Sequence, residues 1–231
     1  MLGKLILLLF IVLTINTNAQ RVVDVNKDNV NAAALVLAVG GEPFSSVKYV
    51  KVVEGTPYFR EEWMRGSVTL KDSNEYLNLR LRLDLVANTV EYISKTGQQL
   101  VASSALREIR LVDSITGKSF RFIHSSTIPA KEVTTGWYEV LVEGKATLLK
   151  RIHKEIQETK PYSSATTEQR INSVNQYFLL SNKSLSRVKK IKDLPGLLPD
   201  KKELLLKKID EQKLTGKNEQ DYMELIRYYN Q

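Results

Sequence analysis

Two short patterns in the sequence have the spacing of a serine-acylation site. Ser45-x-x-Lys48 and Lys95-Thr96-Gly97 match two patterns that occur together in enzymes acylated on a serine. In those enzymes the serine opens a helix, whereas Ser45 leads into a valine-rich stretch that predicts a strand. The Ser-x-x-Lys spacing also recurs at residues 186–189. We therefore interpret both patterns as chance matches.

The imidazole groups also fail to form a recognisable site. The chain has two histidines, His124 and His153, and no cysteine. They fall in different predicted elements, and neither has a second ligand at helical spacing, as a zinc site on a helix requires. The pair His153-x-Glu155 lacks the later cysteine pair of the zinc deaminases. The sequence therefore predicts no metal site, and we interpret both histidines as structural or surface residues.

The carboxylates do not complete a known arrangement either. Residues 24–28 alternate oxygen ligands as a calcium loop does, but Asn29 and Leu35 replace its glycine and its bidentate glutamate. Glu61 and Glu62 are adjacent, so on a strand they face opposite ways and cannot act as a glycosidase pair. The sequence has no phosphate-binding glycine loop, dinucleotide fingerprint or Gly-x-Ser-x-Gly turn. We expect no cofactor and favour a non-enzymatic protein; a hydrolase assembled from scattered positions is the enzymatic alternative.

The elements that would position any site are mainly strands. In residues 77–85, leucine occupies every odd position and a polar residue every even one. This period of two predicts a strand with one buried face, because helical packing would point the leucines in all directions. Further strands are predicted at 67–71, 89–93, 106–112, 118–123, 137–142 and 146 to about 152. Short turn sequences separate them, which predicts an antiparallel meander forming a curved sheet or a partly open barrel.

Two stretches are less regular. Residues 24–65 contain one clear strand pattern, at 47–53, and a group of aromatic residues that we interpret as core packing. Residues 159–170 have little apolar content and several hydroxyl side chains, which favours a mobile loop. A last hairpin is expected from strands at 173–180 and 184–191 around the turn Ser181-Asn182-Lys183.

The C-terminus is predicted to be helical. Asp200 and Glu203 have the spacing of a capping box, and an apolar stripe from Leu204 to Leu214 ends before Gly216. A second helix is expected from about Asn218, with apolar residues at spacings of three and four. Two such short helices are marginally stable alone, so we expect them to pack on the sheet or on a partner. The fold class is therefore α+β, mainly β, with a meander followed by two short helices.

Positive charge is concentrated near the C-terminus. Residues 145–231 hold 18 Lys and Arg against 11 Asp and Glu, whereas residues 20–144 hold 15 of each. Such asymmetry is typical of a solvated helical surface or of a surface that contacts an anionic partner. The candidate partner-binding residues are Lys201, Lys202, Lys207 and Lys208. We expect an envelope protein or an anionic surface component as partner and no nucleic acid.

The first nineteen residues have the layout of a secretory signal peptide. Lys4 supplies a positive charge, an apolar run of about eleven residues follows, and small residues precede a cleavage site between Ala19 and Gln20. That run is too short to span a bilayer, and no later apolar run is long enough to cross as a helix. Because the chain has no cysteine, it forms no disulfide and carries no lipid on an N-terminal cysteine. We expect an exported protein, periplasmic or secreted, that is free or peripheral to the outer membrane.

Several short segments of the chain form a recognisable set: Val39-Gly40-Gly41-Glu42-Pro43, Gly55-Thr56-Pro57-Tyr58-Phe59, Tyr138-Glu139-Val140-Leu141 and the closing Tyr228-Tyr229-Asn230. With these segments the chain resembles uncharacterised exported β-rich proteins of Bacteroidota-type bacteria. The resemblance covers most of the chain after residue 19 and has no catalytic residues to transfer. It implies an envelope location and a β-rich body with a helical tail.

These observations divide the chain into three parts: a signal peptide at 1–19, an antiparallel β-rich domain at 20–194 and a basic helical segment at 195–231 that packs on the sheet. The hypothesis we favour is a non-enzymatic exported module that binds a partner or an envelope component through the helical segment. The alternative is a carrier that holds a lipid or another amphiphile against the leucine face of a curved half-barrel. The sequence leaves open whether that face is core or cavity.

Overall fold

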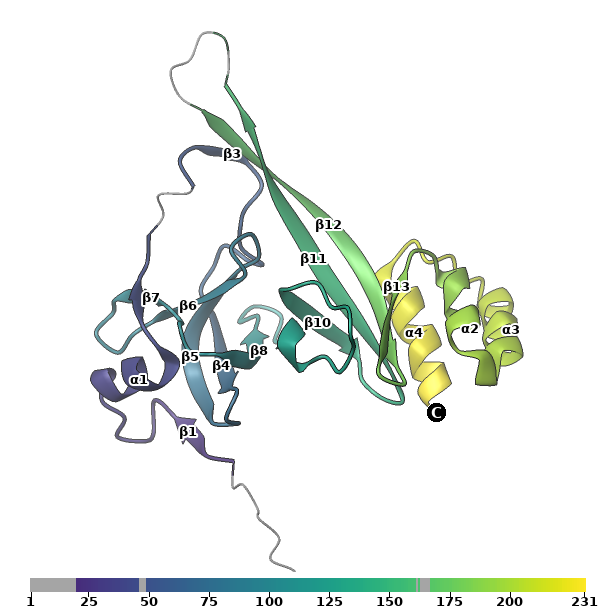
Figure 1. The fold of residues 1–231 in the computed structure, drawn as a ribbon, viewed down its shortest axis with the longest axis horizontal. Helices are drawn as coiled ribbons and strands as arrows, with labels where there is room; N and C mark the ends of the chain where they lie inside the picture. Colours follow the sequence, from purple (N-terminus) through teal and green to yellow (C-terminus); the bar gives the residue numbers. More distant parts are fainter. Residues whose placement is uncertain (1–19, 46–48, 161, 163–166) are drawn as a thin grey trace, which may run out of the picture.

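The computed structural model describes residues 20–45, 49–160, 162 and 167–231. The expected signal peptide and Ala19 lie outside the described residues, and Gln20 is exposed at their start. The described chain is mainly β, with a 13-stranded, largely antiparallel open sheet followed by C-terminal helices (Figure 1). The predicted fold class is confirmed.

The strands are β1 (Val22–Asp24), β2 (Glu42–Pro43), β3 (Val52–Glu54), β4 (Met64–Leu70), β5 (Glu75–Asp84), β6 (Thr89–Ile93), β7 (Gln99–Val101), β8 (Leu106–Val112), β9 (Ser119–His124), β10 (Trp137–Val142), β11 (Ala146–Thr159), β12 (Glu168–Ser181) and β13 (Ser184–Val188). The helices within the described residues are α1 (Ala32–Val39), α2 (Leu194–Leu197), α3 (Lys202–Gln212) and α4 (Glu219–Asn230). Single 3₁₀ turns lie at Ser125–Thr127, Ile191–Asp193 and Pro199–Lys201.

Most neighbouring strands in the sheet are also neighbours in the sequence. The order is β13-β12-β11-β10-β9-β8-β4-β5-β6-β7-β2. Several turns between them use residues with left-handed backbone: Ser73, Asn88, Gly97, Gly117 and Asn182 have φ of 71°, 57°, 83°, 69° and 49°. Asn and Gly tolerate that conformation best, which explains why the turn sequences located the strands correctly.

The meander is interrupted once, and the sheet is curved. β8 pairs with β4 rather than with β7, which precedes it in the chain. The indole Nε1 of Trp137, on β10, donates to the carbonyl oxygen of Asn88, at the start of β6, over 3.3 Å. Five strand spacings separate β6 from β10, which is about 24 Å in a flat sheet. The contact therefore requires a strongly curved sheet.

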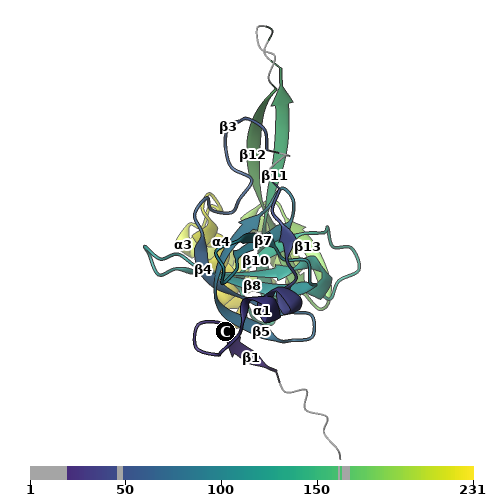
Figure 2. The same cartoon turned by 90° about the vertical axis from the view of Figure 1, so that its left-hand side faces the viewer.

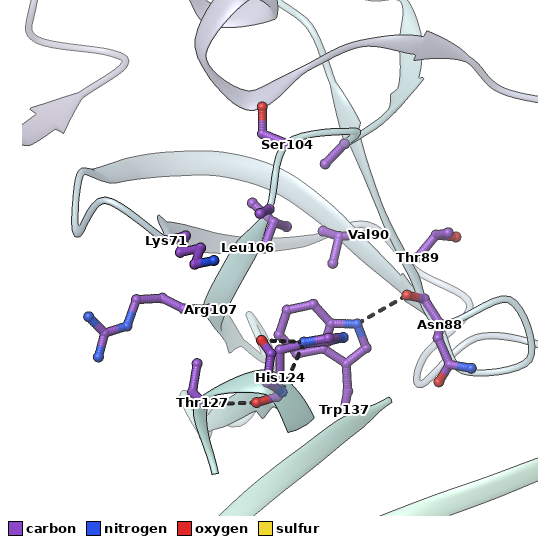
Figure 3. A pocket seen from close by; sticks show the side chains of 13 residues that line it. Lys71, Asn88, Thr89, Val90, Ser104, Leu106, Arg107, His124, Thr127 and Trp137 are labelled. Atoms are coloured by element: carbon purple, nitrogen blue, oxygen red, sulfur yellow. Dashed lines mark hydrogen bonds between the residues drawn. The ribbon is translucent and has the colours of Figure 1, made fainter. Parts of the chain in front are cut away.

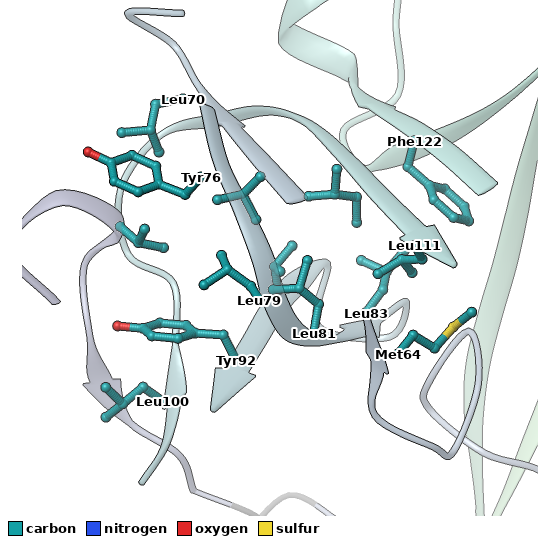
Figure 4. Packing of buried hydrophobic residues seen from close by; sticks show 14 of the residues in the cluster. Met64, Leu70, Tyr76, Leu79, Leu81, Leu83, Tyr92, Leu100, Leu111 and Phe122 are labelled. Carbon is teal, nitrogen blue, oxygen red and sulfur yellow. The ribbon is translucent and has the colours of Figure 1, made fainter. Parts of the chain in front are cut away.

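The leucine face of β5 is core. Leu79, Leu81 and Leu83 are at most 2% exposed and belong to one apolar cluster with Tyr92 of β6 and Phe122 of β9. Figure 4 shows these side chains facing one another across the curve of the sheet. Full burial of one such side chain contributes about 1.5–3 kcal/mol, so this cluster is the main source of stability for the part of the molecule that we call the body (residues 20–45 and 61–124).

β11 and β12 form a hairpin that extends past the body. Each strand has 14 residues, and Figures 1 and 2 show its far half projecting beyond the rest of the molecule. We call this far half, residues 153–160 and 167–175, the arm. Its outer residues are mostly exposed, whereas Leu148 and Leu179 near the other end are fully buried.

Residues 49–60, which we call the strap, connect the arm to the body. β3 lies within the strap and pairs in parallel with β12 at Gln169 and Arg170. The ammonium group of Lys154, on β11, donates to the carbonyl oxygens of Thr56 and Tyr58 at 2.8 and 2.6 Å. Gly55 has a φ of 76°, and a Cβ there would lie 2.2 Å from the Ile171 carbonyl oxygen, so only glycine fits.

A second apolar core lies under the C-terminal helices. Leu205 of α3 and Tyr222 and Leu225 of α4 pack with Leu148 of β11 and Leu179 of β12. The Asn230 side chain at the end of α4 both accepts from the backbone nitrogen of Ala146 and donates to its carbonyl oxygen, at 3.0 and 2.9 Å. The helical segment therefore packs on the sheet.

Among the described residues, buried charged side chains gather in two places: the body, where they include Asp84, and the sheet under the C-terminal helices. In the body cluster, the guanidinium of Arg82 donates twice to Glu91 and lies 3.8 Å from the ring centre of Tyr58 and 4.5 Å from that of Trp63. Gln99 also donates to Glu91, at 3.2 Å. Burial raises the pKa of Glu91, which is 1% exposed.

The helix cluster has one cation for two carboxylates. The ammonium group of Lys150, on β11, lies 2.6 Å from Glu139 of β10 and 2.7 Å from Glu219 of α4. The side chains of Lys150 and Glu139 are 10% and 5% exposed. Burial raises the pKa of Glu139 against the opposing effect of Lys150. The cluster fixes the first turn of α4 to the sheet.

Three expectations about local structure were wrong. Asp200 does not cap α3: it lies in a 3₁₀ turn, where its carboxylate accepts from Lys145 and Tyr229. α3 ends at Gln212, and its C-cap is Lys213 in the left-handed conformation with a φ of 53°, rather than the expected Gly216. β11 and β12 reach into the range 159–170 where a loop was expected, although residues 161 and 163–166 are outside the described chain.

The first part of the chain also differs from expectation. α1 was not predicted, because its sequence Ala-Ala-Ala-Leu-Val-Leu-Ala-Val is apolar on every side and carries no helical period. The strand expected at 47–53 is shorter and later: β3 covers Val52–Glu54, and residues 46–48 lie outside the described chain. The strand expected at 184–191 ends at Val188.

Candidate functional site

A cleft of about 660 Å³ opens where the ends of several strands meet beside the curve of the sheet. Its walls come from the residue after β4, the start of β6, the segment from β7 into β8, the end of β9 and the start of β10. The volume lies within the range of about 300–1,000 Å³ that is usual for small-molecule sites. The lining residues are Lys71, Asn88, Thr89, Val90, Ala102, Ser104, Ala105, Leu106, Arg107, His124, Ser126, Thr127 and Trp137.

The cleft combines an apolar centre with a cationic side. Val90 and Trp137 are buried, and Leu106 is half-buried beside them. Figure 3 shows Lys71 and Arg107 on one side, Asn88 on the opposite side, and His124 and Trp137 between them. Both cationic side chains are exposed, and no carboxylate lines the cleft. A ligand with an anionic end and an apolar part therefore finds complementary groups here.

Local backbone pairing positions the two cations. Lys71 follows β4, and its backbone nitrogen donates to the Ala105 carbonyl oxygen at 2.9 Å, which holds it beside the start of β8. Arg107 is the second residue of β8, and its guanidinium donates to the Ser73 hydroxyl at 3.1 Å. Neither cation is paired with a carboxylate within the described part of the chain. Their charge is therefore available to a ligand.

His124 is held by the 3₁₀ turn that it caps. Its Nδ1 accepts from the backbone nitrogen of Ser126 at 3.3 Å and lies 2.8 Å from the Ser126 hydroxyl. With Nδ1 as acceptor, the neutral ring carries its proton on Nε2 and is a donor there. Burial lowers the pKa of His124, which favours the neutral ring. Its edge meets Trp137 at a centroid distance of 5.2 Å.

A larger hollow of about 860 Å³ lies beside α1 and β1. Its charged side chains have both signs: Arg21, Asp28 and Asp72 all line it. One cation against two carboxylates gives this hollow no excess of positive charge, so the cleft beside Trp137 is the better candidate for an anionic ligand. No group of three metal-ligating side chains is found among the described residues, and within them no helix is long and apolar enough to span a bilayer.

The four lysines predicted to bind a partner differ in their contacts. Lys201 donates to the Tyr229 carbonyl oxygen at 2.9 Å, and Lys208 lies 3.5 Å from the carboxylate of Glu224 on α4. Lys207 pairs weakly with Glu211 on its own helix at 3.6 Å, and Lys202 is exposed. Two of the four therefore hold α3 and α4 together.

No motif or spacing in the sequence predicts the cleft. His124 was interpreted as structural, and Lys71, Arg107 and Trp137 belong to separate strands with no common spacing. Comparison of the chain with protein-family models, with curated proteins and with solved structures finds no match.

Proposed function

We propose that the chain is a non-enzymatic exported binding module whose cleft takes a small anionic ligand with an apolar part, such as an amphiphile with a carboxylate or phosphate head. The proposal rests on one observation. Lys71 and Arg107 lie beside an apolar centre, and among the described residues no carboxylate lines the cleft. This retains amphiphile binding, which the leucine-rich strand suggested, but places it in the cleft, because protein side chains cover the leucine face.

The two cations and the indole have complementary roles. A hydrogen bond from a charged donor contributes about 1.5–3 kcal/mol, which is enough to orient an anionic head at the side formed by Lys71 and Arg107. The apolar part of the ligand would then cover Leu106 and Trp137, where burial of apolar surface contributes about 25 cal/mol per Å². The His124 Nε2–H adds a neutral donor near the indole.

The test is binding of a fluorescent fatty acid to residues 20–231, with its methyl ester as the neutral comparison. We expect saturable binding of the acid, with the ester at least about tenfold weaker because it lacks the charge that the two cations recognise. The double variant Lys71→Gln/Arg107→Gln should lose about tenfold or more in affinity for the acid. The matched control is Arg80→Gln/Lys95→Gln, which removes two exposed cations outside the cleft and should bind as the parent does.

Two results would overturn the proposal: equal affinity for acid and ester, or equal loss in both double variants. Lys71 and Arg107 are exposed, so their replacement should change unfolding free energy by no more than about 0.5 kcal/mol. An unfolding curve of each variant therefore separates lost binding from lost folding.

A second candidate function rests on the hydrogen bond between His124 and Ser126. A serine beside an imidazole is the start of a nucleophile–base pair, as in many hydrolases. Such a pair needs a third group, usually a carboxylate, to orient the imidazole, and no carboxylate lines the cleft. Hydrolysis of nitrophenyl esters that Ser126→Ala abolishes would favour this candidate over the binding module.

A further inference from the structure

Two lysine-rich turns lie side by side at the helical end of the molecule. One is residues 189–193, between β13 and α2, and the other is residues 213–217, between α3 and α4 (Figure 1). A Cβ on Gly216 would lie 3.0 Å from the Ile191 side chain, which places the turns in contact. We call the lysines of these turns the basic patch: Lys189, Lys190, Lys192, Lys213 and Lys217.

The five ammonium groups are exposed and unpaired. Each of the five residues is exposed, and within the described ranges none lies within 4.0 Å of a carboxylate. By contrast, Lys145, Lys150 and Lys208 in the same third of the chain all have carboxylate partners. The basic patch therefore gathers five exposed and unpaired ammonium groups in one place, although Lys183, Arg187, Lys202 and Arg227 are also exposed and lack a carboxylate partner among the described residues.

The acids nearest to the basic patch are used by the backbone. The Asp193 carboxylate accepts from the backbone nitrogens of Lys189 and Lys190 at 3.0 and 2.9 Å. The Asp221 carboxylate accepts from the backbone nitrogens of Thr215 and Gly216 at 2.9 and 2.7 Å. These contacts fix the shape of both turns, and neither carboxylate lies within 4.0 Å of an ammonium group of the basic patch. Both turns therefore have a backbone held by hydrogen bonds and carry exposed positive charge.

We propose that the basic patch docks the protein on an anionic phospholipid bilayer, through the phosphates of the head groups. All five cations are lysines, whose ammonium groups act as point charges, whereas recognition of carboxylates on a protein favours the planar fork of arginine. The lysines lie on two turns rather than around a groove, which suits a flat charged surface. Each basic residue near such a surface strengthens binding about fivefold. The inference is independent of the cleft and its ligand.

The experiment is co-sedimentation of residues 20–231 with vesicles. We expect binding to vesicles of phosphatidylcholine with one part in four phosphatidylglycerol, and weak binding to pure phosphatidylcholine. Raising salt from 0.05 to 0.5 M should release the protein, because the attraction is screened within about 10 Å at 0.1 M salt. Replacing all five lysines of the basic patch by glutamine should lower the partition coefficient by about a hundredfold or more.

The matched control removes the same number of charges elsewhere. Its five substitutions to glutamine are at exposed lysines outside the basic patch: Lys27, Lys95, Lys118, Lys131 and Lys160. Loss of binding only in the patch variant supports the proposal, and equal loss in both variants overturns it in favour of general charge attraction. The cleft variant Lys71→Gln/Arg107→Gln should bind vesicles as the parent does; if it does not, the cleft rather than the basic patch holds the lipid.

The partner could instead be an acidic protein surface, for which a poly-glutamate peptide serves as the probe. Binding of the peptide with no binding to anionic vesicles would overturn the proposal. All variants change exposed side chains and should keep the unfolding midpoint of the parent. A patch variant that unfolds earlier is replaced by the pair Lys189→Gln/Lys213→Gln, one from each turn, for which we expect a loss of about twentyfold.

Discussion

The body cluster and the helix cluster both bury charged side chains, but they compensate the buried charge in different ways. In the body, Arg82 and Glu91 neutralise each other, and Gln99 and the rings of Tyr58 and Trp63 complete their surroundings. Under the helices, one ammonium group serves two carboxylates from different elements. The first arrangement lies mostly within one pair of neighbouring strands, whereas the second joins a helix to the sheet.

The difference indicates how each end of the molecule is held. If Lys150 is lost, two carboxylates remain close together, one of them buried, and the first turn of α4 loses its polar anchor, while Asn230 still holds the other end. If Arg82 is lost, Glu91 keeps the hydrogen bond from Gln99, and the strand ladder between β5 and β6 remains. We therefore expect the helix cluster to be the more sensitive of the two.

The largest effect is expected for Lys150→Met. Removing one partner from a buried charge group costs about 3–5 kcal/mol, because the remaining charge is left uncompensated. Trp63 lies in the body and Trp137 packs into its apolar cluster, so fluorescence reports mainly on the body, whereas circular dichroism at 222 nm reports mainly on the helices. In urea, the dichroism midpoint should fall further than the fluorescence midpoint.

The exposed Lys145→Met is the control for that measurement. Lys145 pairs with Asp200 at 2.7 Å, but its side chain is 64% exposed, and exposed pairs contribute about 0–1 kcal/mol. The triple variant Glu139→Gln/Lys150→Met/Glu219→Gln removes the unpaired charges and should recover most of the loss. Equal shifts of the two midpoints in Lys150→Met would contradict the division into two ends and indicate one cooperative unit.

A smaller loss of stability, affecting mainly the body, is expected for Arg82→Met. Glu91 would lose its bidentate partner inside the body, at a cost of about 2–3 kcal/mol, since Gln99 still donates to it. Here the fluorescence midpoint should fall further than the dichroism midpoint. Arg80→Met, at an exposed position on the same strand, should change either midpoint little. A larger loss in Arg82→Met than in Lys150→Met would reverse the comparison.

The two ends also differ in how far the sequence predicts them. The leucines of β5 have a period that only a half-buried strand can use, so their burial followed from the sequence. α4 begins directly after Asn218, where a helix was expected, and the Asn218 side chain caps it by accepting from the Asp221 nitrogen. The cap of α3 was wrong, because Asp200 is used by Lys145 and Tyr229, which are distant in sequence. Local capping patterns cannot anticipate such tertiary competition.

The arm and the cleft lay beyond sequence reasoning for a common reason. The outer part of β11 is Glu155-Ile156-Gln157-Glu158-Thr159, which is polar on both faces and so lacks the alternation that marks a strand. The cleft depends on the curve that brings Asn88 beside Trp137, across four intervening strands. The arm and the cleft both depend on contacts between residues far apart in the sequence, and such contacts produce no periodic pattern in it.

The smallest expected effect is a dependence of stability on alkaline pH, with one tyrosine at each end. Burial, with the charge of Glu91 adding to it, raises the pKa of Tyr58 to about 12. Burial beside Glu219 likewise raises the pKa of Tyr177 to about 12. Between pH 10 and 12 the unfolded chain loses these protons while the folded chain keeps them, so rising pH favours unfolding. Each tyrosine should cost about 1 kcal/mol per pH unit in that window.

Urea unfolding at pH 9, 10 and 11, followed by both probes, measures this dependence. Tyr58→Phe should lessen the pH dependence seen by fluorescence, and Tyr177→Phe the one seen by dichroism, since phenylalanine has no proton to lose. Other buried tyrosines with a raised pKa, such as Tyr92 and Tyr222, keep part of each dependence. Tyr177 also stacks on Tyr222 at 4.7 Å, and a phenylalanine keeps that contact, so stability at pH 8 should change little. If either variant flattens both curves equally, the tyrosines report one cooperative unit, and the two charge clusters then stabilise one structure rather than two separate ends.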